Sequence, residues 1–313
     1  MIPVKSSACP WRDRDAVLGM NVAHIDRSKK TSNRDLILYD GHHADHGIRN
    51  MNMKRQGQDM LASLMDAERK AGEAILGVYG STIQADLKAD RSPVTAADRI
   101  SHEILTDHLR RHTSFPILSE EGKDIPYDER RQWETFWLLD PLDGTKEFLS
   151  RNGEFTVNAA LIDHGLPVLG AIYVPVKDLL YTAIRGNGAY RTGQGATVRL
   201  PLGQRPRACT VVGSRSHASP AYEAYLRELR AGYGELVLLS AGSSLKFCLV
   251  AEGAADLYPR MGTTMEWDTA AGQLIVEEAG GHVVEAASGA QLRYNKADLR
   301  NPHFIVSGRG YHG

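Results

Sequence analysis

The sequence predicts an α/β protein built from two lobes. Residues 57–200 are rich in strand patterns, with a dense apolar run at residues 136–139 and apolar–polar alternation at residues 155–161. Beyond that region, strand-like and helix-like runs alternate along residues 201–313. Sheet-rich structure followed by such alternation is typical of two α/β-type lobes, which we expect to join near residue 200.

Two helices are expected at the start of the first lobe. Apolar residues recur at helical spacing from Met60 to Val78, and Gly80 can end this helix. Thr95 can cap a second helix, whose apolar positions run from Ile100 to Leu109. Strands are expected at residues 115–118, 136–139, 155–161, 168–174, 179–184 and, after a Gly186-Asn187-Gly188 turn, at residues 189–190.

The second lobe alternates between the two kinds of element. Its strands are expected at residues 210–212, 236–239, 255–258 and 303–306, and its helices at residues 220–231, 243–252 and 269–279. Gly280-Gly281 can close the last helix.

Residues 1–56 differ in composition from the rest of the chain. They contain ten Lys or Arg against six Asp, so the remaining residues 57–313 carry about −5 of the total formal charge of −1. The early basic residues are not followed by the apolar run of a secretory signal. We expect this segment to be poorly ordered, or to be an extension upstream of a natural start at Met51, Met53 or Met60. His42, His43 and His46 are interpreted as a solvated cluster.

The bulk composition excludes several classes of protein. The chain has 313 residues, of which 42% are hydrophobic, and no stretch approaches the roughly 18 apolar residues of a membrane span. The near-neutral charge gives no overall attraction to nucleic acid. Cys9, Cys209 and Cys248 are isolated and lack zinc spacing, which favours a reducing cytoplasm and, for the last two, buried thiols. We therefore expect a cytoplasmic protein that does not bind nucleic acid.

The most informative segment is Asp-Pro-Leu-Asp-Gly-Thr-Lys-Glu-Phe at residues 140–148, directly after the buried-strand pattern. It places Asp140 and Asp143 three positions apart at the end of a strand. The following Gly144-Thr145 step can open a helix, whose free backbone N–H groups suit a phosphate. Carboxylates in this arrangement suit a metal ion with oxygen ligands, although Asp and Gly are also ordinary turn residues.

Other acidic residues also lie at the ends of expected elements. These are Asp98, Glu120, Glu121 and Asp268. Taken singly, Asp268 can be a helix cap, Glu120 and Glu121 a solvated turn, and Asp98 a partner of the helix dipole. Together they form a set of hard oxygen ligands that suits Mg²⁺ or Mn²⁺ better than zinc.

The order and spacing of these acids resemble the inositol monophosphatase superfamily of lithium-sensitive, magnesium-dependent phosphatases. The matching residues are Asp98, Glu120-Glu121, residues 140–145, Trp267-Asp268 and, after eleven further residues, Gly280-Gly281. The resemblance covers roughly residues 57–310. It implies a two-lobed layered αβαβα sandwich of the inositol monophosphatase and fructose-1,6-bisphosphatase type, with metals in the cleft between the lobes.

Within this superfamily, the chain is similar to the CysQ-type 3'(2'),5'-bisphosphate nucleotidases. The likeness depends on residues 88–95, 140–148, 153–158, 213–217, 242–247 and 257–260. It implies adenosine 3',5'-bisphosphate as the substrate, with AMP and phosphate as products, and the sulfated nucleotide PAPS as a second substrate. The alternatives are a phosphatase of inositol or sugar monophosphates and a non-catalytic nucleotide sensor. Attachment to the inner face of the cell membrane would be peripheral, and the sequence does not reveal the oligomeric state.

The resemblance also implies two or three divalent ions, with Mg²⁺ expected and Mn²⁺ the alternative. One ion is expected to be held by Glu120, Asp140 and the Leu142 carbonyl, and a second by Asp140, Asp143 and Asp268. A third, weaker ion would share Glu120, with Glu121 lying behind the ligands.

The same resemblance implies roles around the substrate. Thr145 is expected to orient the attacking water, with Asp98 holding its hydroxyl, and the Gly144 and Thr145 N–H groups would receive the phosphate that is cut. The rest of the nucleotide needs a second subsite, for which the candidates are Arg215, Ser216, His217 and Lys246. Taken alone, Lys246 can also be a solvated lysine on a helix face.

Overall fold

The computed structural model describes residues 41–81, 85–87, 93–203, 208–214 and 219–311. Contacts along the chain divide it into two units, Met1–Asn52 with Gly313, and Met53–His312. Helix α1, Gly41–Tyr79, crosses the boundary between them. The sheets and the candidate site belong to Met53–His312, which is the unit described below.

The larger sheet is formed mainly by hairpins. Among the described residues it has seven strands in the order β3-β4-β5-β6-β7-β8-β9. Its strands are β3 (Ile117–Ser119), β4 (Thr135–Asp143), β5 (Thr156–Asp163), β6 (Leu166–Val174), β7 (Leu179–Ile184), β8 (Gly188–Gly193) and β9 (Ala196–Arg199). Only the β3–β4 pair is parallel within this sheet as described, so β3 and β4 both end at the same edge.

The second sheet is mixed. In the described part of the chain it has five strands in the order β11-β10-β12-β14-β13. Its strands are β10 (Cys209–Gly213), β11 (Leu236–Ser240), β12 (Leu257–Arg260), β13 (His282–Glu285) and β14 (Phe304–Ser307). Strand β10 pairs in parallel with β11 and β12, whereas β14 pairs antiparallel with β12 and β13.

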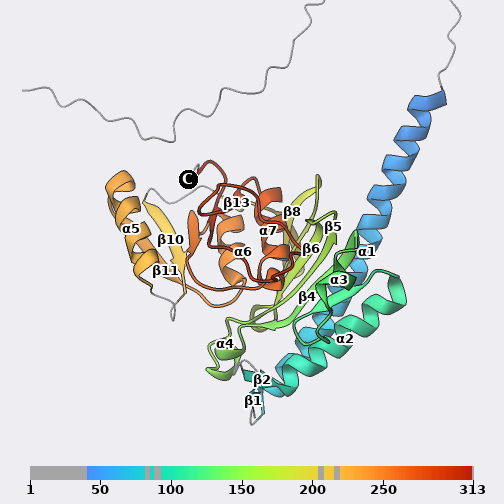
Figure 1. Cartoon of the computed structure of the whole chain (residues 1–313), viewed down its shortest axis with the longest axis horizontal. Helices are drawn as coiled ribbons and strands as arrows, with labels where there is room; N and C mark the ends of the chain where they lie inside the picture. Colours follow the sequence, from blue (N-terminus) through green and yellow to red (C-terminus); the bar gives the residue numbers. More distant parts are fainter. Residues whose placement is uncertain (1–40, 82–84, 88–92, 204–207, 215–218, 312–313) are drawn as a thin grey trace, which may run out of the picture. The chain divides into compact units, whose positions relative to one another are not determined.

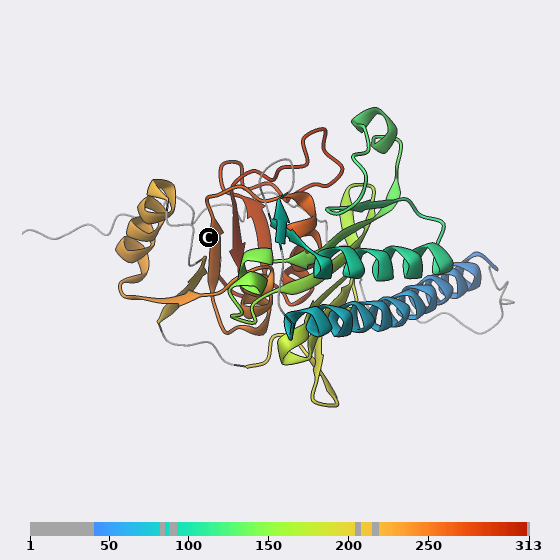
Figure 2. The same cartoon turned by 90° about the horizontal axis from the view of Figure 1, so that it is seen from below.

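Helices cover both sheets and fill the space between them, as Figure 1 shows. Within this unit, the part of α1 from Met53 on and helix α2 (Ala96–His112) cover the outer face of the larger sheet, side by side in Figure 2. Helices α6 (Leu245–Glu252) and α7 (Ala270–Glu278) lie between the two sheets, and α5 (Pro220–Tyr233) covers the outer face of the smaller one. The layered αβαβα fold implied by the resemblance is confirmed.

The side chains of β4 explain how this layering follows from the sequence. Phe136 and Leu138 pack into the core shared with α6 and α7, whereas Trp137 and Leu139 pack into the core shared with α1 and α2. Because successive side chains of a strand point to opposite faces, a continuous apolar run requires cover on both sides. The remaining described elements are short: β1 (Ala85–Leu87), β2 (Pro93–Thr95), α3 (Tyr127–Arg130), α4 (Thr145–Leu149), η1 (Pro175–Lys177) and η2 (Glu266–Asp268).

The element bounds differ from the expected ones in a few places. Helix α1 begins at Gly41, well before Met60 and inside the segment that composition sets apart. Residues 41–56 carry no apolar stripe, so the pattern that reveals packed helices gives no signal there. Strand β9 was not expected, because all four of its residues are exposed and the alternation of a half-buried strand is missing. Cys209 and Cys248 are buried free thiols, as predicted.

The described helices were also compared with the requirements of a membrane span. No helix within residues 41–81, 93–203 or 219–311 is long and apolar enough to cross a bilayer. Peripheral attachment to a membrane stays a prediction.

Helix α1 carries an acidic side chain in the core. Glu68 is fully buried beside Leu64, Ala67 and Ala71, and neither of its carboxyl oxygens has a hydrogen-bond partner among the described residues. Burial raises the pKa of Glu68 well above its ordinary value of 4.5. The folded protein therefore keeps this proton at a pH where the unfolded chain has already released it.

This burial predicts a pH-dependent stability. As the pH rises above 4.5, the unfolded state loses the Glu68 proton first, so the free energy of unfolding falls until the folded-state pKa is passed. We expect Glu68→Met to raise the free energy of unfolding at pH 8 by about 1–3 kcal/mol and to flatten its dependence on pH. Denaturant unfolding between pH 5 and pH 9 measures both effects. Glu73→Met, at an exposed position of the same helix, is the control. An equal gain in both variants would contradict the account.

Candidate active site

The site begins where β4 loses its regular pairing with β5. The register shifts between Asp140 and Asp143, so the chain bulges at Pro141 and Leu142. Leu142 N–H donates to Asp140 Oδ1 at 3.1 Å, and the Ser101 hydroxyl donates to the Pro141 carbonyl at 2.6 Å. The bulge places the two acidic residues at the end of the strand and buries Leu142 between them.

Gly144 turns the chain from β4 into α4. It has a φ of 93°, in the left-handed region that glycine adopts without strain. A Cβ at this position would also lie 3.2 Å from the Cβ of Ser243 and 3.2 Å from Glu147 Oε2. Glycine therefore lets the second lobe approach the start of α4 closely.

Four acidic side chains from three segments gather beside this turn: Asp140 and Asp143 from β4, Glu120 and Asp268. Glu120 follows β3, and its N–H donates to the Leu139 carbonyl of β4 at 3.1 Å, while Asp268 lies in η2. Burial, followed by the charges of Glu120, Asp143 and Asp268, raises the pKa of Asp140 well above its usual value. Burial and then the charge of Asp143 do the same to the pKa of Asp268. The structure thus brings together Glu120, Asp140, Asp143 and Asp268, in a cluster of like charges.

The chemistry of this cluster suits a hard cation. Repulsion between buried carboxylates is relieved when a divalent ion lies among them, and oxygen donors of this kind are the ligands of Mg²⁺. Among the described residues, no group of three or more His, Cys, Asp or Glu side chains is already arranged as a ligand set. The acidic residues fit a magnesium site by their donor type and by the repulsion that a bound ion would relieve.

Asp98 and Thr145 form a hydrogen-bonded pair next to the cluster. The Thr145 hydroxyl donates to Asp98 Oδ1 at 3.2 Å, while the N–H and hydroxyl of Thr95 both donate to Asp98 Oδ2 at 2.7 Å. Asp98 is the third residue of a capping box at the start of α2, so its orientation is fixed by the helix that it caps. Burial raises the pKa of Asp98, and the nearby charge of Glu121 adds to this rise.

Of the four residues predicted for the second subsite, the structure describes Lys246. It is buried in the first turn of α6, and its Nζ donates to the carbonyl of Ser243 at 2.6 Å and lies 5.3 Å from the centre of the Tyr258 ring. Burial lowers the pKa of Lys246 to about 8, against the opposing attraction of Asp143. The other predicted residues of this subsite, Arg215, Ser216 and His217, lie outside the described residues.

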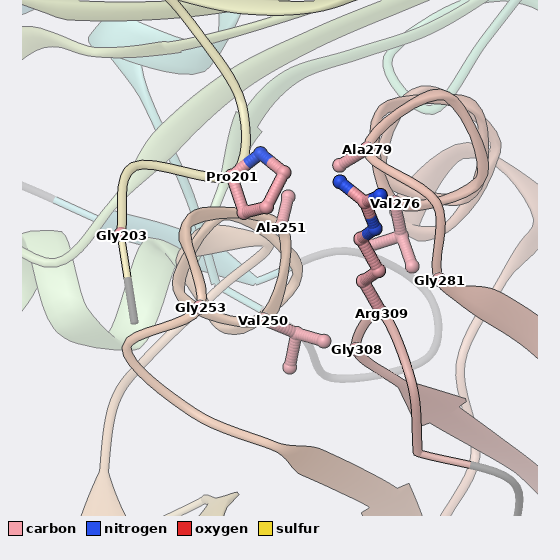
Figure 3. Close-up of a pocket in the computed structure, with 10 residues that line it drawn as sticks. All are labelled: Pro201, Gly203, Val250, Ala251, Gly253, Val276, Ala279, Gly281, Gly308 and Arg309. Carbon is pink, nitrogen blue, oxygen red and sulfur yellow. The ribbon is translucent and has the colours of Figure 1, made fainter. Parts of the chain in front are cut away.

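A cavity of about 110 Å³ lies between Asp143, Asp268 and Lys246. It is lined from both lobes, by Asp143 and Gly144 on one side and by Lys246, Arg260 and Asp268 on the other. Another cavity, of about 370 Å³, lies elsewhere, between α6, α7 and the chain before β10. Figure 3 shows that its lining is mostly apolar and that Arg309 extends past Val276 toward Ala279. No acidic residue lines this larger cavity, so the carboxylates that could bind a metal ion are at the smaller one.

Several polar residues of the site were not singled out by the sequence. Ser244 contacts both Asp143 and Asp268, Asn158 donates to Ser244 Oγ, and Glu154 accepts from the Gly242 N–H. All three lie in segments that carry the resemblance, at residues 153–158 and 242–247. In the sequence, each of these residues is a polar side chain within a run of mostly apolar or small residues. Apolar–polar alternation alone assigns such a residue to an ordinary strand or helix-cap position.

The comparisons with known proteins agree with this fold. The model of the inositol monophosphatase family matches residues 56–312, and the chain belongs to that family. Members of the family are metal-dependent phosphatases that generally use Mg²⁺.

Individual relatives are more specific. The chain is 48% identical, over 253 residues, to the 3'(2'),5'-bisphosphate nucleotidase CysQ of Escherichia coli K12, covering 79% of this chain and 99% of that protein. It is 33% identical to the CysQ of Haemophilus influenzae, over 80% of this chain and 93% of the relative. The crystal structure of CysQ from Bacteroides thetaiotaomicron has a TM-score of 0.74 at 48% identity, covering 81% of this chain and 98% of the other.

Proposed function

We propose that this chain is a Mg²⁺-dependent 3'(2'),5'-bisphosphate nucleotidase. Its substrate is adenosine 3',5'-bisphosphate, which it converts to AMP and phosphate, and PAPS is its second substrate. The observation that carries the proposal is the gathering of Glu120, Asp140, Asp143 and Asp268, of which Asp143 and Asp268 line one cavity together with the buried Lys246. The 48% identity to nucleotidases of this name supports the choice of substrate.

The acidic residues divide between the ions in the proposal. Glu120, Asp140 and the Leu142 carbonyl would hold one ion, and Asp140, Asp143 and Asp268 would hold a second. A third, weaker ion would share Glu120, with Glu121 behind the ligands. Bound Mg²⁺ would lower the pKa of a water molecule and neutralise charge on the phosphate. Mg²⁺ is proposed because members of the family generally use it, and the same oxygen ligands would also accept Mn²⁺.

Thr145 and Asp98 handle the proton of the attacking water. A water that donates to Thr145 Oγ can give its proton to that oxygen while the Thr145 hydroxyl proton moves to Asp98 Oδ1, so the proton ends on Asp98. Because burial raises the pKa of Asp98, its carboxylate is a better proton acceptor than an exposed aspartate. The two donors from Thr95 keep its other oxygen occupied, so Asp98 presents a single oxygen to Thr145.

The substrate's two phosphates occupy separate subsites in the proposal. The phosphate to be cut lies against the N–H groups of Gly144 and Thr145, where the chain enters α4. The remaining phosphate is held by Lys246 together with Arg215, Ser216 and His217. With a pKa of about 8, Lys246 is mostly charged at neutral pH and attracts a phosphate dianion.

Phosphate release from a panel of substrates tests the proposal. We expect kcat/KM for adenosine 3',5'-bisphosphate to exceed that for inositol 1-phosphate and for sugar monophosphates by about 10²-fold or more, because loss of one subsite phosphate removes about 3 kcal/mol of charge-assisted binding. Chelation of Mg²⁺ should abolish release, and millimolar lithium should inhibit it.

The alternative functions give different results in the same assay. A preference for inositol 1-phosphate would indicate an inositol monophosphatase. Tight binding of the nucleotide without any phosphate release, with Mg²⁺ present, would indicate a sensor. Phosphate release that continues after Mg²⁺ is chelated, or that lithium does not inhibit, would contradict the metal-dependent reaction.

A further inference from the structure

Ser244 joins the acidic residues of the two lobes. Its N–H and its hydroxyl each lie 2.6 Å from Asp143 Oδ2, and the hydroxyl also lies 2.8 Å from the carbonyl oxygen of Asp268. Asp143 ends β4 in the first lobe, whereas Asp268 and Ser244 belong to the second. Ser244 is buried, with 2% of its surface exposed, so water does not compete for these contacts.

These contacts give the two carboxylate oxygens of Asp143 different partners. Oδ2 accepts from the Ser244 N–H, from the Ser244 hydroxyl and from Asn158 Nδ2, the last at 3.3 Å. Asn158 is itself oriented, because its Oδ1 accepts from the Thr156 hydroxyl at 3.0 Å. With Oδ2 occupied by protein donors, Oδ1 is the oxygen that Asp143 can offer to a cation. Partners of this kind orient a ligand and commonly change metal affinity by about 10–100-fold when they are removed.

The segment that carries Ser244 also carries Lys246. Ser243 has a φ of 45°, an uncommon conformation for a residue with a side chain, and its carbonyl accepts from Lys246 Nζ at 2.6 Å. On the other side, the Gly242 N–H donates to Glu154 Oε2 at 2.9 Å. The segment is therefore anchored at Gly242, at Ser244 and at Lys246, within five residues.

A phosphate at Lys246 would disturb this arrangement. Nζ has three protons, and a phosphate dianion is a stronger acceptor than the Ser243 carbonyl that it now contacts. A change at the Ser243 carbonyl moves the same peptide unit that supplies the Ser244 N–H to Asp143. The two binding events thus share one peptide group.

We propose that Ser244 is a positioning residue that couples metal binding at Asp143 to phosphate binding at Lys246. The inference rests on the proposed function for the identity of the two ligands. Nucleotide binding then changes the affinity for metal, and metal binding changes the affinity for nucleotide by the same factor.

Mn²⁺ titration, followed by electron paramagnetic resonance with and without AMP, tests this coupling without turnover. In the unaltered chain we expect AMP to change the Kd for Mn²⁺ by about fivefold or more. In Ser244→Ala, the Kd for Mn²⁺ alone should rise by about tenfold or more, and AMP should change it by less than about twofold. Reciprocal titration of AMP at saturating Mn²⁺ should give the same factors.

Two further variants separate coupling from loss of structure. Ser219→Ala removes a serine that caps α5 away from the acids, so it should lower thermal stability without changing either Kd. Glu154→Gln weakens the Gly242 anchor of the same segment, so it should raise the Kd for Mn²⁺ alone and reduce the effect of AMP, each by less than Ser244→Ala does. Equal Mn²⁺ affinities in the unaltered chain and Ser244→Ala, or equal losses in Ser244→Ala and Ser219→Ala, would overturn the inference. Absence of Mn²⁺ binding in the unaltered chain would instead overturn the proposed function.

Discussion

Replacing Asp143 or Asp268 by Asn is expected to lower kcat by about 10²-fold or more, as when a catalytic metal ligand is lost. Both substitutions keep the size of the side chain and remove one negative charge from the acidic cluster. Loss of that charge weakens the attraction for a divalent ion, so kcat should fall even at saturating nucleotide. Steady-state phosphate release at increasing Mg²⁺ measures the effect.

Stability should change in the opposite direction for Asp268→Asn. Burial and the charge of Asp143 raise the pKa of Asp268, which means that its ionised form is disfavoured in the folded protein without metal. The Asn variant should therefore have a higher melting temperature than the unaltered chain in a chelator, and a smaller stabilisation by added Mg²⁺. Asp298→Asn, at an exposed surface ion pair, is the matched control. Retained activity in both cluster variants would contradict the metal assignment.

Thr145→Val is expected to lower kcat by about 10²–10⁴-fold, the usual contribution of a positioned proton-transfer group. Valine fills nearly the same space but has no hydroxyl, so the path from a water molecule to Asp98 Oδ1 is broken. The backbone N–H of residue 145 remains, and for that reason KM should change much less than kcat. Steady-state kinetics at saturating Mg²⁺ gives both constants.

Two companion variants define the role of this pair. Thr145→Ser keeps a hydroxyl and should retain most of the activity, whereas Asp98→Asn should lose about as much as Thr145→Val. If Thr145→Val instead raised KM and left kcat unchanged, Thr145 would be a binding residue and the proton path would be wrong.

The fold could be predicted where buried residues recur along the sequence with the period of a helix or a strand. The apolar run at residues 136–139 predicts a strand covered on both faces, and the structure places its alternate residues in two different cores. Strand β9 and the first part of α1 carry no such pattern, so their residues gave no signal. Glu68 shows the opposite case: it lies four residues after Leu64, on the apolar face, and the charge of its side chain concealed its burial.

The candidate site could be predicted in its local parts only. Asp140 and Asp143 could be recognised because they end a strand pattern and precede a Gly-Thr step. Thr95 and Asp98 could be recognised by the spacing of a helix-capping pattern. The approach of Asp268 to Asp143 depends on α6 and α7 packing between the two sheets, which no local pattern encodes. The role of Ser244 could not be predicted for the same reason, because its contacts are with residues 24 and 101 positions away in the sequence.

The anomalous scattering of a crystal grown with Mn²⁺ tests the central claim most directly. The account predicts strong anomalous peaks among the carboxylates of Glu120, Asp140, Asp143 and Asp268, with Asp143 Oδ1 as a ligand and Oδ2 still facing Ser244. Anomalous peaks only at other places on the molecule, in crystals of a protein that releases phosphate with Mn²⁺, would contradict it.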